Sequence, residues 1–112
     1  MEKKFKASYD EIEDIFSISS GKRSKFSIDL ALPSGDVVVD VGYDGLIIGL
    51  EIFNASKFFS VIEKELVKVK DASLNVIYSP SYVAISMNLK QEDKIIRNNL
   101  IVPYNKKLVL SA

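Results

Sequence analysis

Five side chains in the first half of the chain are the first candidates for chemistry: Asp10, Asp40, Asp44, Glu51 and Tyr43. Paired carboxylates can act as general acid and base, and their oxygens are ligands that Mg²⁺ and Ca²⁺ prefer. The spacing contains no Asp-x-Asp-x-Asp-Gly calcium loop, and Asp44 precedes a glycine, where aspartate commonly stabilises a turn. We therefore treat these five residues as a speculative ligand or partner surface. We predict no catalytic, cofactor-binding or metal-ligating residue.

The amino-acid composition narrows the chemistry further. The 112 residues include no histidine and no cysteine. Without histidine the usual general base near neutral pH is missing, as is the commonest ligand of zinc, copper and iron. Without cysteine there are no disulfides, thiolate metal sites or thiol nucleophiles. We therefore expect no enzyme and no cofactor.

Charge and hydropathy indicate the compartment and exclude two classes of partner. Fifteen basic residues balance fifteen acidic ones, for a formal net charge of zero, so we expect no nucleic-acid partner. No apolar run approaches the ~20 residues that a membrane-spanning helix needs. The charged start MEKKFKASYD lacks the apolar region of a signal peptide. We expect a cytoplasmic protein with no membrane partner.

Alternating and β-branched segments predict that most of the chain forms strands. We expect strands at residues 5–9, 15–19, 25–32, 36–41, 46–53, 74–78, 82–89, 95–102 and 107–110. Pro33-Ser34-Gly35 and Tyr43-Asp44-Gly45 are turn signals between them. Gly49 falls inside a strand, where glycine marks a bulge or a close backbone approach. The expected fold class is α+β, with about nine mainly antiparallel strands in a curved sheet or partly open barrel.

Residues 55–70 change to a helical period, with one apolar stripe formed by Phe58, Phe59, Ile62, Leu66 and Val69. Asn54 precedes this segment. Asparagine is a favoured N-cap because its side-chain oxygen accepts hydrogen bonds from the first-turn N–H groups. Ser56 is expected to help cap the helix. The sequence therefore predicts one amphipathic helix near residues 55–70 that packs its stripe on the sheet.

The stretches YDEIEDIFSIS and VVVDVGYDGLIIGLEIFNAS carry a recurring pattern. Its residues are Tyr9, Asp10, Asp14, Val37, Val39, Asp40, Asp44, Gly45, Ile47, Gly49, Glu51, Ile52, Ala55 and Ser56. On these residues, over about residues 5–60, the chain resembles a small prokaryotic family catalogued as domain of unknown function 2283. Val41 and Gly42 stand where family members tend to carry a tyrosine and an acid, which puts a shared acidic patch in doubt. The resemblance also implies membership of paired gene cassettes of the toxin–antitoxin kind.

The length of 112 residues fits a single domain. Within it, residues 74–86 parallel residues 5–18, and residues 102–111 resemble the family's Val-Asp-Tyr-Asp followed by Ile-Val-Gly. These parallels fit a degenerate internal duplication of residues 5–53 and 74–111. They also fit chance similarity between short strands, and the sequence leaves both open.

The leading functional hypothesis is a non-catalytic module that binds a protein partner or associates with itself as a homodimer. It follows from the missing catalytic residue types and from a fold rich in strand edges, which can pair with another chain. One alternative is a domain that binds a small ligand or a divalent metal through a carboxylate cluster of Asp40, Asp44 and Glu51 together with nearby tyrosines. A second alternative is a carboxylate-based hydrolase.

Overall fold

The computed structural model describes residues 2–103, which form eight strands and two short helices. The elements are β1 (Glu2–Asp10), β2 (Ile15–Ser19), β3 (Ser24–Leu32), β4 (Gly35–Gly42), β5 (Ile47–Phe53), α1 (Ala55–Phe59), α2 (Glu63–Val67), β6 (Asp71–Tyr78), β7 (Tyr82–Lys90) and β8 (Ile95–Pro103). The strands form one sheet in the order β3-β4-β5-β2-β1-β6-β7-β8. All neighbouring pairs are antiparallel.

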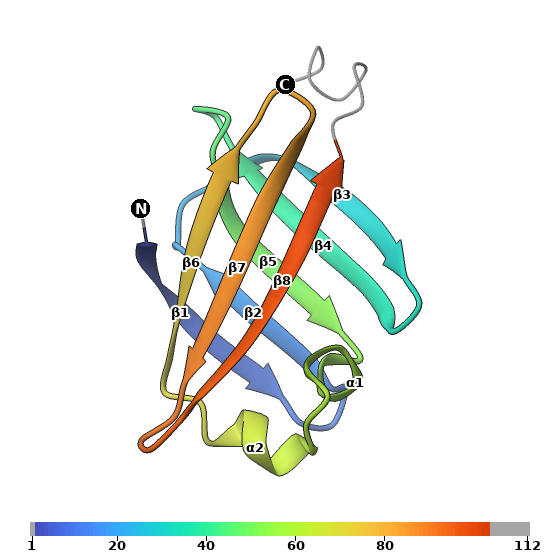
Figure 1. Cartoon of the computed structure of the whole chain (residues 1–112), viewed down its shortest axis with the longest axis vertical. Helices are drawn as coiled ribbons and strands as arrows, with labels where there is room; N and C mark the ends of the chain where they lie inside the picture. Colours follow the sequence, from blue (N-terminus) through green and yellow to red (C-terminus); the bar gives the residue numbers. More distant parts are fainter. Residues whose placement is uncertain (1, 104–112) are drawn as a thin grey trace.

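Strand β1 makes the sheet curl because its two halves pair with different neighbours. Residues 2–5 pair with β6, whereas residues 6–10 pair with β2. The sheet consequently folds over on itself as a half-barrel, with β6, β7 and β8 in front of β2, β5 and β4 (Figure 1). Both helices lie at one end of the molecule, and the β6–β7 turn lies at the other end (Figure 1).

A single apolar core fills the space between the two layers. Alternate residues of each strand point inward, among them Val37 and Val39 from β4 and Ile85 and Met87 from β7, all with no exposed surface. Fully burying a side chain of this kind contributes about 1.5–3 kcal/mol. The two-residue periodicity that predicts the strands therefore also selects the residues that hold the layers together.

The structure confirms mainly antiparallel β structure and the turn signals, with eight strands among the described residues. The ninth candidate, residues 107–110, lies outside the described part of the chain. Gly35 and Gly45 adopt φ of +142° and +82° in their turns. A Cβ on Gly49 would lie 2.9 Å from the Ile18 carbonyl oxygen, so a close backbone approach requires glycine at this position.

The prediction of one continuous helix is wrong. Helix α1 ends at Phe59. The next residue, Ser60, caps it with a left-handed φ of 56°, and Val61 N–H donates to the Ser56 carbonyl oxygen at 3.0 Å. This is a Schellman C-cap. The break turns Ile62 outward, so that it is 67% exposed rather than part of a buried stripe. In the described chain no helix is long and apolar enough to cross a membrane.

Candidate functional site

Three residues from three elements meet where α1 begins. Tyr9 lies near the end of β1, Asp14 lies in the β1–β2 turn, and Ser56 lies in the first turn of α1. The Tyr9 hydroxyl donates to Asp14 Oδ1 at 2.6 Å, and the Ser56 N–H donates to the same oxygen at 3.0 Å. The Ser56 hydroxyl donates to Asp14 Oδ2 at 2.7 Å. Both carboxylate oxygens of Asp14 therefore have partners within the chain.

These contacts fix the charge of the site. Burial disfavours the charged form of Asp14, but hydrogen bonds from Tyr9 and Ser56 outweigh it, so the pKa of Asp14 lies below its ordinary value. Burial raises the pKa of the Tyr9 hydroxyl, and the hydrogen bond to Asp14 and the negative charges of Asp14, Glu63 and Glu11 raise it further. At neutral pH Asp14 is a carboxylate and Tyr9 a neutral donor, an arrangement suited to holding α1 in place.

Asp14 performs the capping role that the sequence assigned to Asn54. Asn54 does occupy the N-cap position, but it has a left-handed φ of 51° and its side chain makes no capping hydrogen bond. Instead, Ala55 N–H donates to the Asp14 carbonyl oxygen at 3.0 Å, while Ser56 N–H donates to its carboxylate. The prediction was correct that Asn54 is the N-cap residue. It was wrong that the Asn54 side chain accepts the first-turn N–H groups, because the β1–β2 turn, distant in sequence, supplies the acceptors.

The structure distributes the five predicted site residues over separate parts of the molecule. Asp10 accepts hydrogen bonds from Ile12 N–H and Glu13 N–H, both at 3.1 Å, in the β1–β2 turn. Asp44 accepts one from Leu46 N–H at 3.1 Å in the β4–β5 turn, and the neighbouring Tyr43 is 70% exposed. These contacts give Asp10 and Asp44 local roles in shaping turns.

Asp40 and Glu51 lie on the same sheet face of the neighbouring strands β4 and β5. Asp40 on β4 pairs with Gly49 on β5, two residues before Glu51. Asp40 Oδ1 accepts a hydrogen bond from the Ser27 hydroxyl at 2.6 Å, and Glu51 is exposed. Within residues 2–103, no group of three or more acidic, histidine or cysteine side chains is arranged to hold a metal ion. The five residues therefore do not form one carboxylate cluster.

The prediction of site residues omitted Tyr9, Asp14 and Ser56, although a usable signal was present. All three belong to the family pattern in the sequence, alongside Asp10 and Asp40. Their spacing of 5 and 42 residues has no periodicity that indicates contact. A pattern shared with a family was therefore a better guide to this group than the chemistry of each residue taken alone.

Residues 6–56 match the model of a protein family of unknown function, DUF2283. The match confirms the resemblance, and it contains Tyr9, Asp14 and Ser56. It ends before the second half of the chain, so the internal duplication stays a prediction. No solved structure matches the chain at a significant level.

Two curated proteins from archaea are also similar to the chain. The uncharacterized protein MJ0789 of Methanocaldococcus jannaschii is 36% identical over 66 residues, which cover 58% of this chain and 53% of that protein. A Methanosarcina mazei protein named "Putative hypoxanthine phosphoribosyltransferase" is 29% identical over 98 residues, which cover 85% of this chain and 76% of that protein. The chain thus spans about half the length of the first relative and three quarters of the second.

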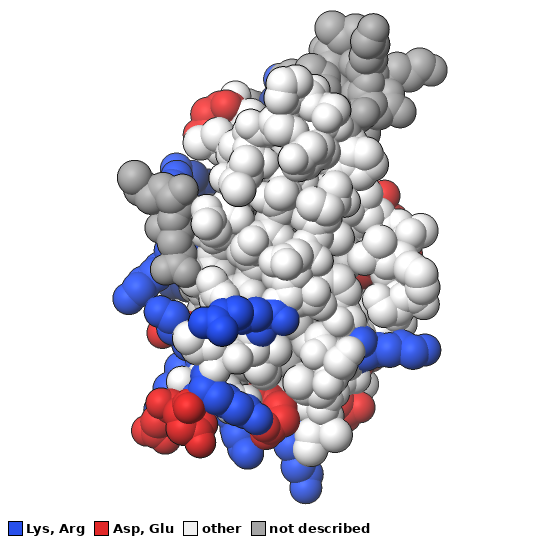
Figure 2. Space-filling view, in the orientation of Figure 1, with Lys and Arg blue, Asp and Glu red and all other residues white. Residues whose placement is uncertain are grey.

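A second candidate surface lies outside the DUF2283 match, on the outer side of β6, β7 and β8. The strand register places two rows of uncharged residues across it: Ile77, Ala84 and Ile101 in one, and Asn75, Ser86 and Asn99 in the other. We call these six residues the neutral face. Ile77 is 59% exposed and Ile101 is 56% exposed. Figure 2 shows a broad uncharged area over these strands, with charged side chains gathered toward the end that carries the helices.

The free edge of β8, at one end of the sheet, is protected near its middle. Asn98 Nδ2 donates to the Phe58 carbonyl oxygen of α1 at 2.8 Å, and Asn98 Oδ1 accepts from the Asn99 N–H at 2.8 Å. The Asn99 N–H therefore points away from β7, and Pro103, on the same side of the regular ladder, has no N–H to offer. These features discourage another chain from pairing with this edge.

Proposed function

We propose that this protein is a non-catalytic interaction module that associates with a second copy of itself through the neutral face. The observation that carries the proposal is the exposure of Ile77 and Ile101 in one row across β6, β7 and β8, with no charged residue in that row or the next. Exposed aliphatic side chains on an uncharged sheet face gain free energy when a similar face covers them.

Symmetry supports a second copy as the partner. A two-fold axis through the row of Ile77, Ala84 and Ile101 would pack this row against itself, with the polar row of Asn75, Ser86 and Asn99 beside it. Arg97, the nearest charged residue on β8, would stay at the rim, because its Nε already donates to Asn88 Oδ1 at 3.2 Å. No like charges would then meet at the centre of the interface.

Size-exclusion chromatography with light scattering at several concentrations tests the proposal. We expect the mass of the full chain to rise from 12.5 kDa toward twice that value as concentration increases. Ile77→Lys and Ile101→Lys should each weaken the dimer by about tenfold or more, because a lysine in the apolar row would lose hydration. Ile95→Lys is the matched control, since Ile95 is 42% exposed on β8 but lies beside Lys90, outside the neutral face.

Two outcomes would contradict this proposal. One is a monomer at every concentration. The other is a dimer that Ile77→Lys and Ile101→Lys leave as strong as the control does. Circular dichroism of each variant would establish that the fold is retained.

The alternative functions gain less support from the geometry. Asp40, Asp44 and Glu51 do not converge, so we do not advance the metal or hydrolase hypotheses. Phosphoribosyl transfer appears in the name of the Methanosarcina relative, and phosphate groups commonly bind free N–H groups at the start of a helix. The Ala55 and Ser56 N–H groups at the start of α1 are not free for this, because they already donate to Asp14.

The absence of a nucleic-acid or membrane partner and the cytoplasmic location stay predictions.

A further inference from the structure

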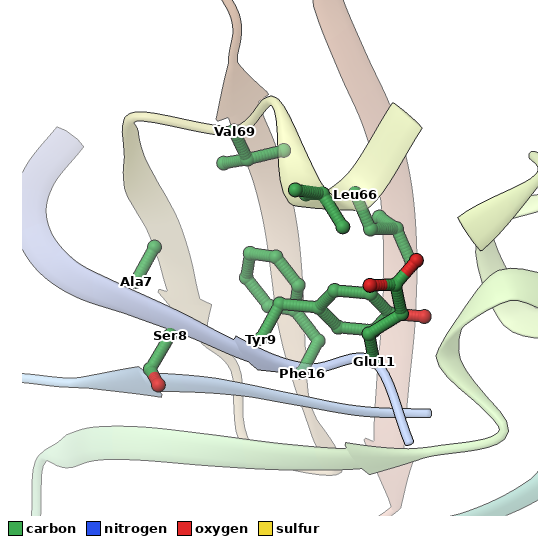
Figure 3. Close-up of a pocket in the computed structure, with 8 residues that line it drawn as sticks. Ala7, Ser8, Tyr9, Glu11, Phe16, Leu66 and Val69 are labelled. Carbon is green, nitrogen blue, oxygen red and sulfur yellow. The ribbon is translucent and has the colours of Figure 1, made fainter. Parts of the chain in front are cut away.

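The eight-stranded sheet ends at β3 on one side and at β8 on the other. In the middle of the sheet, α2 and the chain just after it cover β1 and β2, and Figure 3 shows Leu66 and Val69 directed toward the rings of Tyr9 and Phe16. At one end, Asn98 of β8 contacts α1. At the other end, β3 pairs only with β4 among the described strands. The β3 edge is therefore the end of the sheet to which another strand can be added.

The strand register fixes which backbone groups of β3 point outward. Along an antiparallel strand, the hydrogen-bonding groups of successive residues alternate between the two sides. Ser20 N–H donates to the Ile48 carbonyl oxygen at 2.9 Å, so the Ile48 backbone faces β2. The registers of β5 with β4 and of β4 with β3 then direct the even-numbered residues of β3 toward β4. The residues whose N–H and C=O groups point to the free edge are Ser27, Asp29 and Ala31.

The inner side of β3 leaves apolar surface accessible at this edge. Its inward row is only half buried, and the row consists of Phe26, Ile28, Leu30 and Leu32. These side chains pack against the core cluster, in which Val37, Val39 and Val41 of the neighbouring β4 are buried. A strand added beside β3 would cover the exposed remainder of the row, which favours association.

The charges on the outer side of β3 change sign along the strand. Lys25 is exposed near its beginning, shortly after the exposed Arg23. Asp29 is exposed four residues later, and Asp36 of β4 lies beside Ala31 on the same face. Asp29 forms no ion pair with any described residue. A strand that runs antiparallel to β3 and is basic at its own beginning complements this order of charges, and β3 of a second copy is such a strand.

We propose that β3 pairs antiparallel with β3 of a second copy, about a two-fold axis at Ser27. Lys25 of each copy then lies opposite Asp29 of the other, and Phe26 lies opposite Ile28 on the apolar side. The outward backbone groups of Ser27 face those of its counterpart as a hydrogen-bonded pair, and the two sheets become one. This contact goes beyond the proposed function, because it uses no residue of the neutral face.

Charge selects this register from its neighbours. An axis at Asp29 would set two carboxylates directly opposite each other, which destabilises a strand pair. An axis at Ile28 would place Asp29 opposite Ser27 instead of a cation. Lys25 and the bulge beside it discourage most other strands from pairing here. The same lysine therefore favours a partner strand with an acid in the matching position.

We expect the β3 contact to be weaker than the contact through the neutral face. The β3 row is already partly covered by its own chain, whereas Ile77 and Ile101 are more than half exposed. Less apolar surface is therefore removed from water. The unmodified chain should form assemblies larger than a dimer only at concentrations above those that complete the neutral-face dimer.

Cysteine cross-linking of the full chain tests the pairing, because the chain contains no cysteine of its own. Ser27→Cys sets two thiols across the axis, where a hydrogen-bonded pair has Cα atoms about 5.5 Å apart, within the range of a disulfide. Ala31→Cys is the matched control, since Ala31 is exposed on the same side of β3 but would lie about 27 Å from its counterpart. On mild oxidation, Ser27→Cys should form the disulfide-linked dimer about tenfold or more faster than Ala31→Cys. Equal rates would overturn the β3 contact.

An exchange of charges tests the register. Lys25→Asp and Asp29→Lys are each introduced into the Ile77→Lys chain, so that the neutral face contributes little. Analytical ultracentrifugation at high protein concentration should show that each charge variant associates about tenfold or more weakly than the Ile77→Lys chain. An equimolar mixture should recover the association, because both charge pairs of the mixed dimer again join opposite charges. A mixture that associates no better than its components would contradict the register and the proposal.

The outcomes separate this inference from the proposed function. If Ile77→Lys weakens self-association but Ser27→Cys cross-links no faster than Ala31→Cys, the β3 contact is wrong and the neutral-face dimer stands. If Ser27→Cys cross-links at the expected rate and Ile77→Lys changes nothing, the β3 contact stands and the neutral face is wrong. Ser27→Cys should cross-link equally fast on the Ile77→Lys chain, and a loss of cross-linking there would overturn β3 as a separate contact. Circular dichroism of each variant establishes that the fold is retained.

Discussion

At the scale of residues, the Asp14 carboxylate has a structural role. Asp14 joins β1 to the first turn of α1 through hydrogen bonds from Tyr9 and Ser56. Hydrogen bonds to a charged group are worth about 1.5–3 kcal/mol, more than those between neutral groups. Asp14 also adopts a left-handed φ of 55°, which aspartate tolerates better than most residues. The Tyr9–Asp14–Ser56 group therefore acts as a clamp on the start of α1.

Asp14→Asn is expected to lower the free energy of unfolding at neutral pH by about 1–2 kcal/mol, because an amide accepts fewer hydrogen bonds than a carboxylate. The folded-state pKa of Asp14 lies below its ordinary value of 3.8. The stabilisation is therefore present above the unfolded-state pKa and is lost as pH falls through the lower folded-state pKa. Urea unfolding at several pH values should show the difference from the unmodified chain constant near neutrality and shrinking below 3.8. Asp29→Asn, on the exposed side of β3, is the control, and a difference that does not depend on pH would refute the role of the charge.

At the scale of elements, the helical segment shows how tertiary contacts override a local pattern. The stripe from Phe58 to Val69 predicts one helix, but α1 and α2 are anchored to different parts of the sheet. Asn98 on β8 holds the Phe58 carbonyl of α1, and Gln91 in the β7–β8 turn holds the Glu65 carbonyl of α2. The left-handed Ser60 between them lets the chain change direction. Two short helices can make both of these hydrogen bonds because the break between them reorients the chain.

Asn98→Ala should loosen α1 from the edge of β8. The substitution leaves the Phe58 carbonyl and the Asn99 N–H without their present partner, at an expected cost of about 1–2 kcal/mol. Hydrogen exchange measured by NMR should become faster at the Ser60 and Val61 N–H groups, which close the end of α1. Asn99→Ala on the same strand is the matched control, because its side chain lies on the outer row. Equal effects of the two substitutions would argue against an anchoring role for Asn98.

At the scale of the whole molecule, three features join the two layers into one unit. Strand β1 contributes half its length to each layer. At the end of the molecule opposite the helices, the Tyr78 hydroxyl of β6 accepts a hydrogen bond from Ile47 N–H of β5 at 2.7 Å. The layers also share one core cluster that runs from Phe5 to Val102. A shared strand and a shared core favour a single cooperative unfolding transition.

Tyr78→Phe should destabilise the molecule by about 1 kcal/mol, since it removes the acceptor of the Ile47 N–H. NMR signals from Ile52 in one layer and Ile85 in the other should still disappear at the same urea concentration. Tyr43→Phe is the control, because Tyr43 is 70% exposed in the β4–β5 turn. Separate midpoints for the two layers would show that β1 does not couple them.

The sequence by itself determined the strands and turns of this protein and the chemistry that its composition excludes. Alternating residues mark strands, and Asp44-Gly45 marks a turn, because strand pleat and turn dihedrals depend on residues next to one another. The close approach at Gly49 was also readable, because glycine weakens the interior of a strand and is typical there of a bulge or a close backbone contact.

The tertiary structure alone decided which distant segments meet. It placed β5 beside β2, divided β1 between two neighbours, broke the helix at Ser60 and brought Asp14 to Ser56 across 42 residues. It also separated Asp10, Asp40 and Asp44 and placed Ile77 and Ile101 in one exposed row. The free energy of such contacts depends on how the whole sheet curls and packs, and this leaves no periodicity in the chain from which the contacts could be read.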